Sequence, residues 1–113
     1  MSTRANIIIR DAENHRLSVY HHYDGYLKGV GRKLEHILQS IPKDENNTLP
    51  EALRTLQGLA EYLHSQDDLF KPGVEVADPD YRYEIDLSTR KVEWFHVNCC
   101  TGDVLDQGFL CEF

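Results

Sequence analysis

The chain has 113 residues, of which 41% are hydrophobic and 27% charged, and its formal net charge at pH 7 is −7. This length and composition are typical of one small globular domain covering 1–113. The acidic balance and the dispersed lysines and arginines argue against duplex nucleic acid as a partner, because phosphate binding needs clustered cations. No apolar run approaches the roughly 20 residues that span a bilayer, so no membrane partner is expected either.

The N-terminus and the cysteines bear on location. The run Met1–Arg4 lacks the basic stretch and apolar core of a signal peptide. Cys99 and Cys100 are adjacent and Cys111 makes the count odd, which fits neither a disulfide framework nor the spacing of a zinc site. We therefore expect a cytoplasmic protein with free thiols and no cofactor.

The first third of the chain predicts a hairpin followed by a helix. Residues 6–10 form a β-branched run, and residues 17–23 alternate, with Leu17, Val19 and His21 facing one way. After this second strand the apolar spacing changes to that of a helix. One helix face is formed by Val30, Leu34, Ile37, Leu38 and Ile41, and Pro42 ends the helix.

The remainder predicts a second helix and a group of strands. Thr48, Pro50 and Glu51 are typical of a helix start, and an apolar stripe continues to Leu63. Gly58 within that stripe weakens the helix by about 1 kcal/mol relative to alanine and allows another backbone to come close. A short strand is predicted at 74–76, followed by strands at 81–87, 92–97 and 104–113, the last with a bulge or crossing point at Gly108.

The element order β-β-α-α-β-β-β predicts an α+β fold of two layers, with an antiparallel sheet that carries both helices on one face. A sheet of this size has open edges, and open edges pair readily with other chains. A homodimer is therefore expected, with the apolar end of the last strand, Phe109–Phe113, buried between copies.

The segment Tyr20–Gly31 is the candidate functional site, because it concentrates aromatic, titratable and flexible residues at a strand-to-helix junction. Glycine-rich turns before a helix bring backbone N–H groups toward an anion, with Lys28, Arg32 and Lys33 adding positive charge. Tyrosines supply stacking surfaces. The predicted ligand-binding residues are Tyr20, His22, Asp24, Gly25, Tyr26, Lys28, Gly29 and Gly31. We expect a non-enzymatic module that binds a small anionic ligand or a protein.

Two catalytic alternatives use other residues. A metal-dependent hydrolase would use His22, Asp24 and His96, since three protein ligands and an open position make a catalytic zinc site. His21 and His22 point to opposite faces of a strand, so they do not easily share one metal. A cysteine enzyme would activate Cys99 or Cys100 with His96.

A purely structural interpretation is also open, in which Asp24–Gly25 is a turn and the tyrosines are packing residues.

Two stretches carry a resemblance to a known group. Met1–Ile7 and the run from Tyr20 to Gly31 resemble small bacterial and phage proteins without an assigned reaction, which begin near "STRxxI" and carry "Y-x-H-x-DGYP-x-G-x-G" before a helix. The likeness covers about the first forty residues, with a looser echo in 81–87. It implies a bacterial or phage origin. This chain has Leu27 where the group usually has proline, which removes a rigid turn residue.

Overall fold

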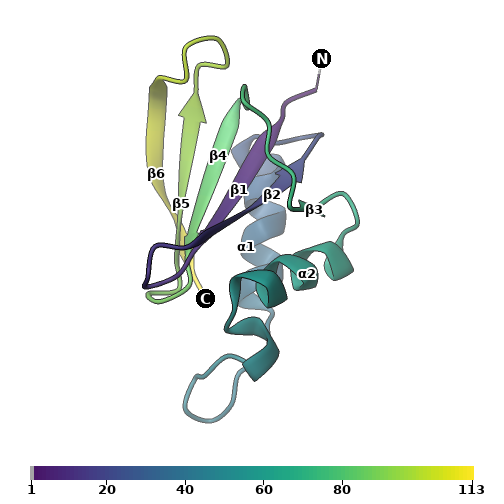
Figure 1. Ribbon diagram of the computed structural model, residues 1–113, viewed down its shortest axis with the longest axis vertical. Helices are drawn as coiled ribbons and strands as arrows, with labels where there is room; N and C mark the ends of the chain where they lie inside the picture. The colour runs from purple at the N-terminus through teal and green to yellow at the C-terminus, as the bar shows by residue number, and fades with distance from the viewer. Residues whose placement is uncertain (1) are drawn as a thin grey trace.

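A computed structural model describes residues 2–113 as a six-stranded sheet and two helices, in the spatial strand order β3-β2-β1-β4-β5-β6 (Figure 1). The predicted α+β class is confirmed. Neither helix in residues 2–113 has the length and apolar character that a membrane crossing requires. The elements are β1 (Ala5–Arg10), β2 (Arg16–His21), α1 (Arg32–Gln39), α2 (Leu56–Gln66), β3 (Lys71–Pro72), β4 (Tyr81–Asp86), β5 (Lys91–Val97) and β6 (Val104–Glu112).

The sheet is mixed, although most of it is antiparallel as predicted. Four neighbouring pairs are antiparallel, and β1 and β4 pair in parallel at its centre. A parallel pair needs a long crossover connection, and here the crossover is the whole stretch from β2 to β4, which contains both helices and β3. The strand pattern alone does not reveal this, because alternation is the same in both kinds of pair.

The core lies between the sheet and the helices. Register places Ile7 beside Val19 and Tyr83, so these side chains share one face, and all are completely buried together with helix residues such as Leu34 and Leu59. The alternation of β2 is confirmed, since Val19 and His21 are buried while Tyr20 between them is partly exposed.

Helix α1 follows the predicted apolar face. A single π-helical turn, Leu27–Gly31, leads directly into the α-helix. The helix ends at Gln39, three residues before Pro42, in agreement with the constraint that proline places on the preceding residue. The predicted face is buried in full: Val30, Leu34, Ile37, Leu38 and Ile41.

Helix α2 starts later than predicted. The Thr48–Glu51 signal is followed by a 3₁₀ turn at Glu51–Leu53, and the α-helix begins only at Leu56, with the Thr55 hydroxyl accepting a bond from the Gly58 N–H at 3.0 Å. The 3₁₀ turn packs closely against the first turn of α2 at Gly58. A Cβ atom on Gly58 would lie 1.7 Å from the carbonyl oxygen of Ala52, so this arrangement requires glycine. The predicted close approach of another backbone is therefore confirmed, and that backbone is the preceding turn.

The segment 73–80, which we call the strap, crosses the sheet face opposite the helices (Figure 1). The strand predicted at 74–76 is wrong: the chain pairs with β2 at Lys71–Pro72, the Gly73 N–H donates to the Ser18 carbonyl at 2.8 Å, and the chain then leaves the edge. The side-chain amide of Asn6 holds the strap, donating to the Val76 carbonyl at 2.8 Å and accepting from the Val76 N–H at 3.1 Å. Ile8, two residues along the same face, is 1% exposed.

Strand β6 forms one edge of the sheet and is irregular. Its register against β5 shifts twice, and exposed Val104, Leu105 and Phe109 lie along it. Gly108 faces Trp94, and a Cβ atom on it would lie 2.7 Å from the indole nitrogen. The predicted crossing point at Gly108 is thus the place where the tryptophan ring covers the neighbouring strand.

Candidate functional site

The turn at Asp24–Gly25 is fixed against the start of β1. Asp24 has a φ of 52°, in the left-handed region that the Asp-Gly pair favours. The Gly25 N–H donates to the Thr3 carbonyl at 2.8 Å, and the buried Tyr83 hydroxyl donates to the Gly25 carbonyl at 2.7 Å. A Cβ atom on Gly25 would lie 2.9 Å from the backbone of Arg4. Gly25 is therefore required for close packing.

The glycines before α1 also serve packing. A Cβ atom on Gly29 would lie 2.1 Å from the Asp24 carbonyl oxygen. The N–H groups of Gly29 and Gly31 both donate to the Tyr26 carbonyl, at 3.0 and 3.4 Å, and that of Val30 donates to the Asp24 carbonyl at 2.7 Å. These N–H groups are used within the loop. Anion binding at this end therefore depends on side chains.

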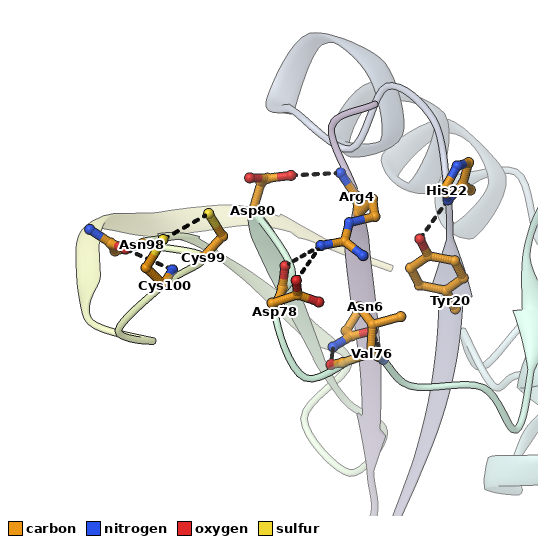
Figure 2. Close-up of polar contacts among 10 residues, drawn as sticks. All are labelled: Arg4, Asn6, Tyr20, His22, Val76, Asp78, Asp80, Asn98, Cys99 and Cys100. Carbon is orange, nitrogen blue, oxygen red and sulfur yellow. Dashed lines mark hydrogen bonds and ion pairs between the residues drawn. The ribbon is translucent and has the colours of Figure 1, made fainter. Parts of the chain in front are cut away.

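The polar end of the segment faces a cavity at the ends of the central strands. The Tyr20 hydroxyl and His22 Nδ1 are hydrogen-bonded at 2.7 Å (Figure 2). His22 also lines a cavity of about 360 Å³. The Tyr26 hydroxyl donates to Asp24 Oδ1 at 3.3 Å. The other residues that line the cavity are Ser2, Arg4, Asp80 and Cys99.

Arg4 is a residue that the sequence reasoning missed. Its guanidinium donates to the Asp78 carbonyl at 2.9 Å and pairs with the Asp78 carboxylate at 2.7 Å, while its backbone N–H donates to Asp80 Oδ2 at 3.0 Å (Figure 2). The guanidinium lowers the pKa of the Asp78 carboxyl below its usual value. The available signal was the arginine of the opening Ser-Thr-Arg motif, whose position in this structure ties the end of the strap to β1.

The cationic end of the segment faces a second hollow, which we call the β6 groove. The groove has a volume of about 410 Å³ and lies between the start of α1 and strands β5 and β6. Lys28 and Arg32 are exposed, and their side chains form no hydrogen bond or ion pair within residues 2–113. The groove is lined by Leu27, Lys28, Arg32, Glu35, Trp94, Phe109 and Leu110.

A larger cavity of about 490 Å³ lies beside the loop before α2 and contains two other arginines, Arg54 and Arg90. Arg54 donates to the Leu49 carbonyl at 2.9 Å, and Arg90 donates to the carbonyls of Asn47 and Phe113. Both guanidinium groups therefore already donate hydrogen bonds to backbone carbonyls and connect segments of the chain. The smaller β6 groove is therefore the better candidate for an anion.

The residues of the hydrolase alternative do not converge. Among residues 2–113, no group of three or more His, Cys, Asp or Glu side chains is placed to hold a metal ion. His22 is bonded to Tyr20, and the ring of His96 stacks on Tyr81 at 4.6 Å between centroids. His21 faces the side of the sheet opposite to His22, as the strand alternation predicts, and it is 1% exposed.

The cysteine alternative has no activated pair. Cys99 and Cys100 are exposed, and neither forms a hydrogen bond with His96 in the described part of the chain, 2–113. A nucleophilic thiol needs a base within hydrogen-bond reach. Cys111 is buried, and burial raises the pKa of its thiol to about 11.

No protein-family model, curated protein or solved structure matches this chain. The assignment of function therefore depends on the geometry of these residues.

Proposed function

We propose that this protein is a binding module for a small anion with an aromatic or other apolar body, which it holds in the β6 groove. One observation carries the proposal: two cationic side chains that have no partner among residues 2–113 stand beside an apolar hollow that contains the exposed ring of Phe109. A concave apolar site with a few convergent polar groups is the usual form of a ligand pocket, and about 410 Å³ lies in the common size range.

The placement of Lys28 and Arg32 is unfavourable for the folded chain by itself. Arg32 is the first residue of α1, and Lys28 lies four residues earlier, in the π-helical turn that leads into the helix, so two like charges stand near each other and repel. The positive end of the helix dipole adds to this repulsion. In a chain of net charge −7, two cations at such a position are better explained by an anion that they bind than by stability.

Glu35 sets the orientation of the ligand. It lies one turn further along the same helix and lines the same groove, so an anionic group is repelled from that end. The charged group of the ligand then lies between Lys28 and Arg32, and its apolar body lies against Trp94 and Phe109. Leu27, at the position where the small bacterial and phage proteins that the N-terminal motif resembles usually have proline, forms part of the apolar wall.

The test uses the fluorescent aromatic sulfonate 8-anilino-1-naphthalenesulfonate as probe. Trp94 is the single tryptophan of the chain and lines the groove, so bound probe quenches the intrinsic fluorescence. The double variant Lys28→Gln/Arg32→Gln is expected to weaken binding between about twofold and thirtyfold, since exposed charge pairs each contribute about 0.2–1 kcal/mol.

The matched control is Lys71→Gln/Lys91→Gln, which removes the same charge from exposed positions outside the groove. The control is expected to keep the affinity, and uncharged N-phenyl-1-naphthylamine is expected to bind both variants equally. Equal weakening by the control, or binding of the sulfonate without quenching of Trp94, would contradict the proposal. A cytoplasmic setting and a bacterial or phage origin are part of the same proposal.

A further inference from the structure

The turn between β5 and β6 brings two sulfur atoms together. In a strand, the side chains of adjacent residues point to opposite faces, so adjacency in the sequence does not make a pair of thiols. Here the chain leaves β5 at Val97, and the Sγ atoms of Cys99 and Cys100 lie 3.9 Å apart (Figure 2). Both residues are exposed.

This turn is held by its own hydrogen bonds. Asn98 Oδ1 accepts from the N–H groups of Cys100 and Thr101, at 2.8 and 3.2 Å. The Asn98 backbone bonds to both sides of the turn, accepting from the Gly102 N–H at 2.7 Å and donating to the Asp103 carbonyl at 2.8 Å. The backbone that carries the two thiols is therefore held in place before any ligand arrives, which reduces the entropy cost of binding.

From this geometry we propose that Cys99 and Cys100 form a dithiol site for a monosubstituted trivalent arsenical. Two sulfurs that share a tetrahedral zinc ion, each about 2.3 Å from it, lie about 3.8 Å apart. A pyramidal arsenic(III) atom has a narrower S–As–S angle, so the two sulfurs need to approach only slightly from the observed 3.9 Å to bridge it. A disulfide would need the sulfurs at about 2.05 Å, and hence a much larger movement of the turn.

The number of ligands selects the arsenical over zinc. A structural zinc ion needs four protein ligands, whereas no third His, Cys, Asp or Glu joins the two thiols in a metal-binding group within residues 2–113. His22 lines the same cavity as Cys99 without completing such a group. A monosubstituted arsenic(III) atom carries its own organic group, so two protein sulfurs complete its coordination.

The reaction is an exchange without oxidation or reduction. The hydrated arsenical R–As(OH)₂ loses two As–O bonds and forms two As–S bonds, and the two thiol protons leave with the hydroxides as two water molecules. Arsenic remains trivalent. Hydrogen bonding and charge from Cys100 raise the pKa of the Cys99 thiol, so an exchange that expels its protons as water suits this pair better than one that needs a free dithiolate.

The test is titration of the reduced protein with phenylarsine oxide, followed by intact-protein mass spectrometry. We expect one adduct per chain, reversed by 2,3-dimercaptopropanol and resistant to an excess of a monothiol. Cys99→Ser and Cys100→Ser are each expected to lower the apparent affinity about 100-fold or more, because only two linked bonds give the chelate its strength.

Cys111→Ala is the matched control, since it removes the buried thiol and leaves the turn unchanged. It is expected to keep the adduct, and circular dichroism melting verifies that every variant is folded. Equal affinity in Cys99→Ser or Cys100→Ser, or loss of the adduct in folded Cys111→Ala, would overturn the proposal. So would one tightly held zinc ion per chain, because zinc would require protein ligands beyond the two thiols.

Discussion

His21 is a buried histidine between an ammonium group and an aromatic ring. Lys33 Nζ donates to His21 Nε2 at 3.2 Å and also forms an ion pair with Asp67. The edge of the imidazole meets the Phe70 ring at 4.8 Å between centroids. His21 Nδ1 is buried without a hydrogen-bond partner within residues 2–113. Burial first, and the charge of Lys33 second, lower the pKa of His21 below its ordinary value of 6.5.

A pH dependence of stability follows from this histidine. Above pH 6.5 the ring is neutral in both the folded and the unfolded chain, and its contribution to stability is fully present. As the pH falls below 6.5, the unfolded chain takes up the proton first, so the free energy of unfolding falls. One such group contributes a slope of up to about 1.4 kcal/mol per pH unit.

The measurement is urea unfolding at pH 7.5, 6.5, 5.5 and 5.0. His21→Gln is expected to have a shallower slope than the natural chain over this range, because glutamine does not titrate. The exposed His36→Gln serves as control and is expected to keep the natural slope. An unchanged slope in His21→Gln would show that the network around Lys33 accommodates the charged ring.

Sequence reasoning placed individual side chains well wherever alternation decided the outcome. It predicted that His21 and His22 face opposite ways, which the structure confirms, because the period of a strand is local. It did not find Lys33 as the partner of His21, or Asp67 as the partner of Lys33, since these contacts join residues 12 and 34 positions apart. It assigned the glycines to a ligand, whereas their backbone contacts in the structure are internal.

At the scale of elements, the strap is the feature that strand propensity misjudged. The run Val74–Val76 has the β-branched composition of a strand, yet it lies across a sheet face and takes its hydrogen bonds from the side chain of Asn6. The late start of α2 is a second difference, because Gly58 makes room for the turn before it. The strap depends on a contact between residues 70 positions apart, which a local pattern does not contain. The start of α2 depends on the nearby residues Ala52, Thr55 and Gly58, whose backbone geometry the apolar stripe does not specify.

The Asn6 side chain is expected to control the strap. Asn6 is 3% exposed and makes both bonds to Val76, so Asn6→Ala leaves a partly buried N–H and C=O without partners. We expect a loss of about 1–3 kcal/mol in the free energy of unfolding. We also expect faster hydrogen exchange in 73–80, measured by mass spectrometry of peptides that cover the strap.

Asn46→Ala is the control, because Asn46 is exposed and only its backbone N–H forms a hydrogen bond. It is expected to leave both measurements unchanged. If Asn6→Ala lost stability but the strap exchanged at the natural rate, the amide would stabilise β1 alone and the role given to it here would be wrong.

At the scale of the molecule, the two edges of the sheet differ. The β3 edge is only two residues long, whereas β6 presents nine residues at the other end of the sheet. Among residues 2–113, three of the seven exposed large hydrophobic residues lie on β6: Val104, Leu105 and Phe109. A long edge with exposed apolar side chains pairs readily with another chain, so the homodimer expected from the sequence remains a prediction, with Val104 and Leu105 of β6 at its interface. Cys111 and Phe113 are buried within the chain, at 3% and 7% exposure, which corrects the expectation that the apolar end of the strand is buried between copies.

Charge sets the conditions under which this dimer forms. Asp106 and Glu112 lie on the same strand, and in a symmetric pair each copy brings its acids toward those of the other. Salt screens such repulsion over about 10 Å at 0.1 M. We therefore expect association at high micromolar concentration that strengthens from 20 mM to 300 mM salt, measured by sedimentation velocity.

Leu105→Lys is expected to remain monomeric, because it places a charge in the apolar contact, while Val74→Lys on the strap is expected to dimerise normally. A natural chain that stays monomeric at high micromolar concentration in 300 mM salt would leave β6 as an edge that does not pair.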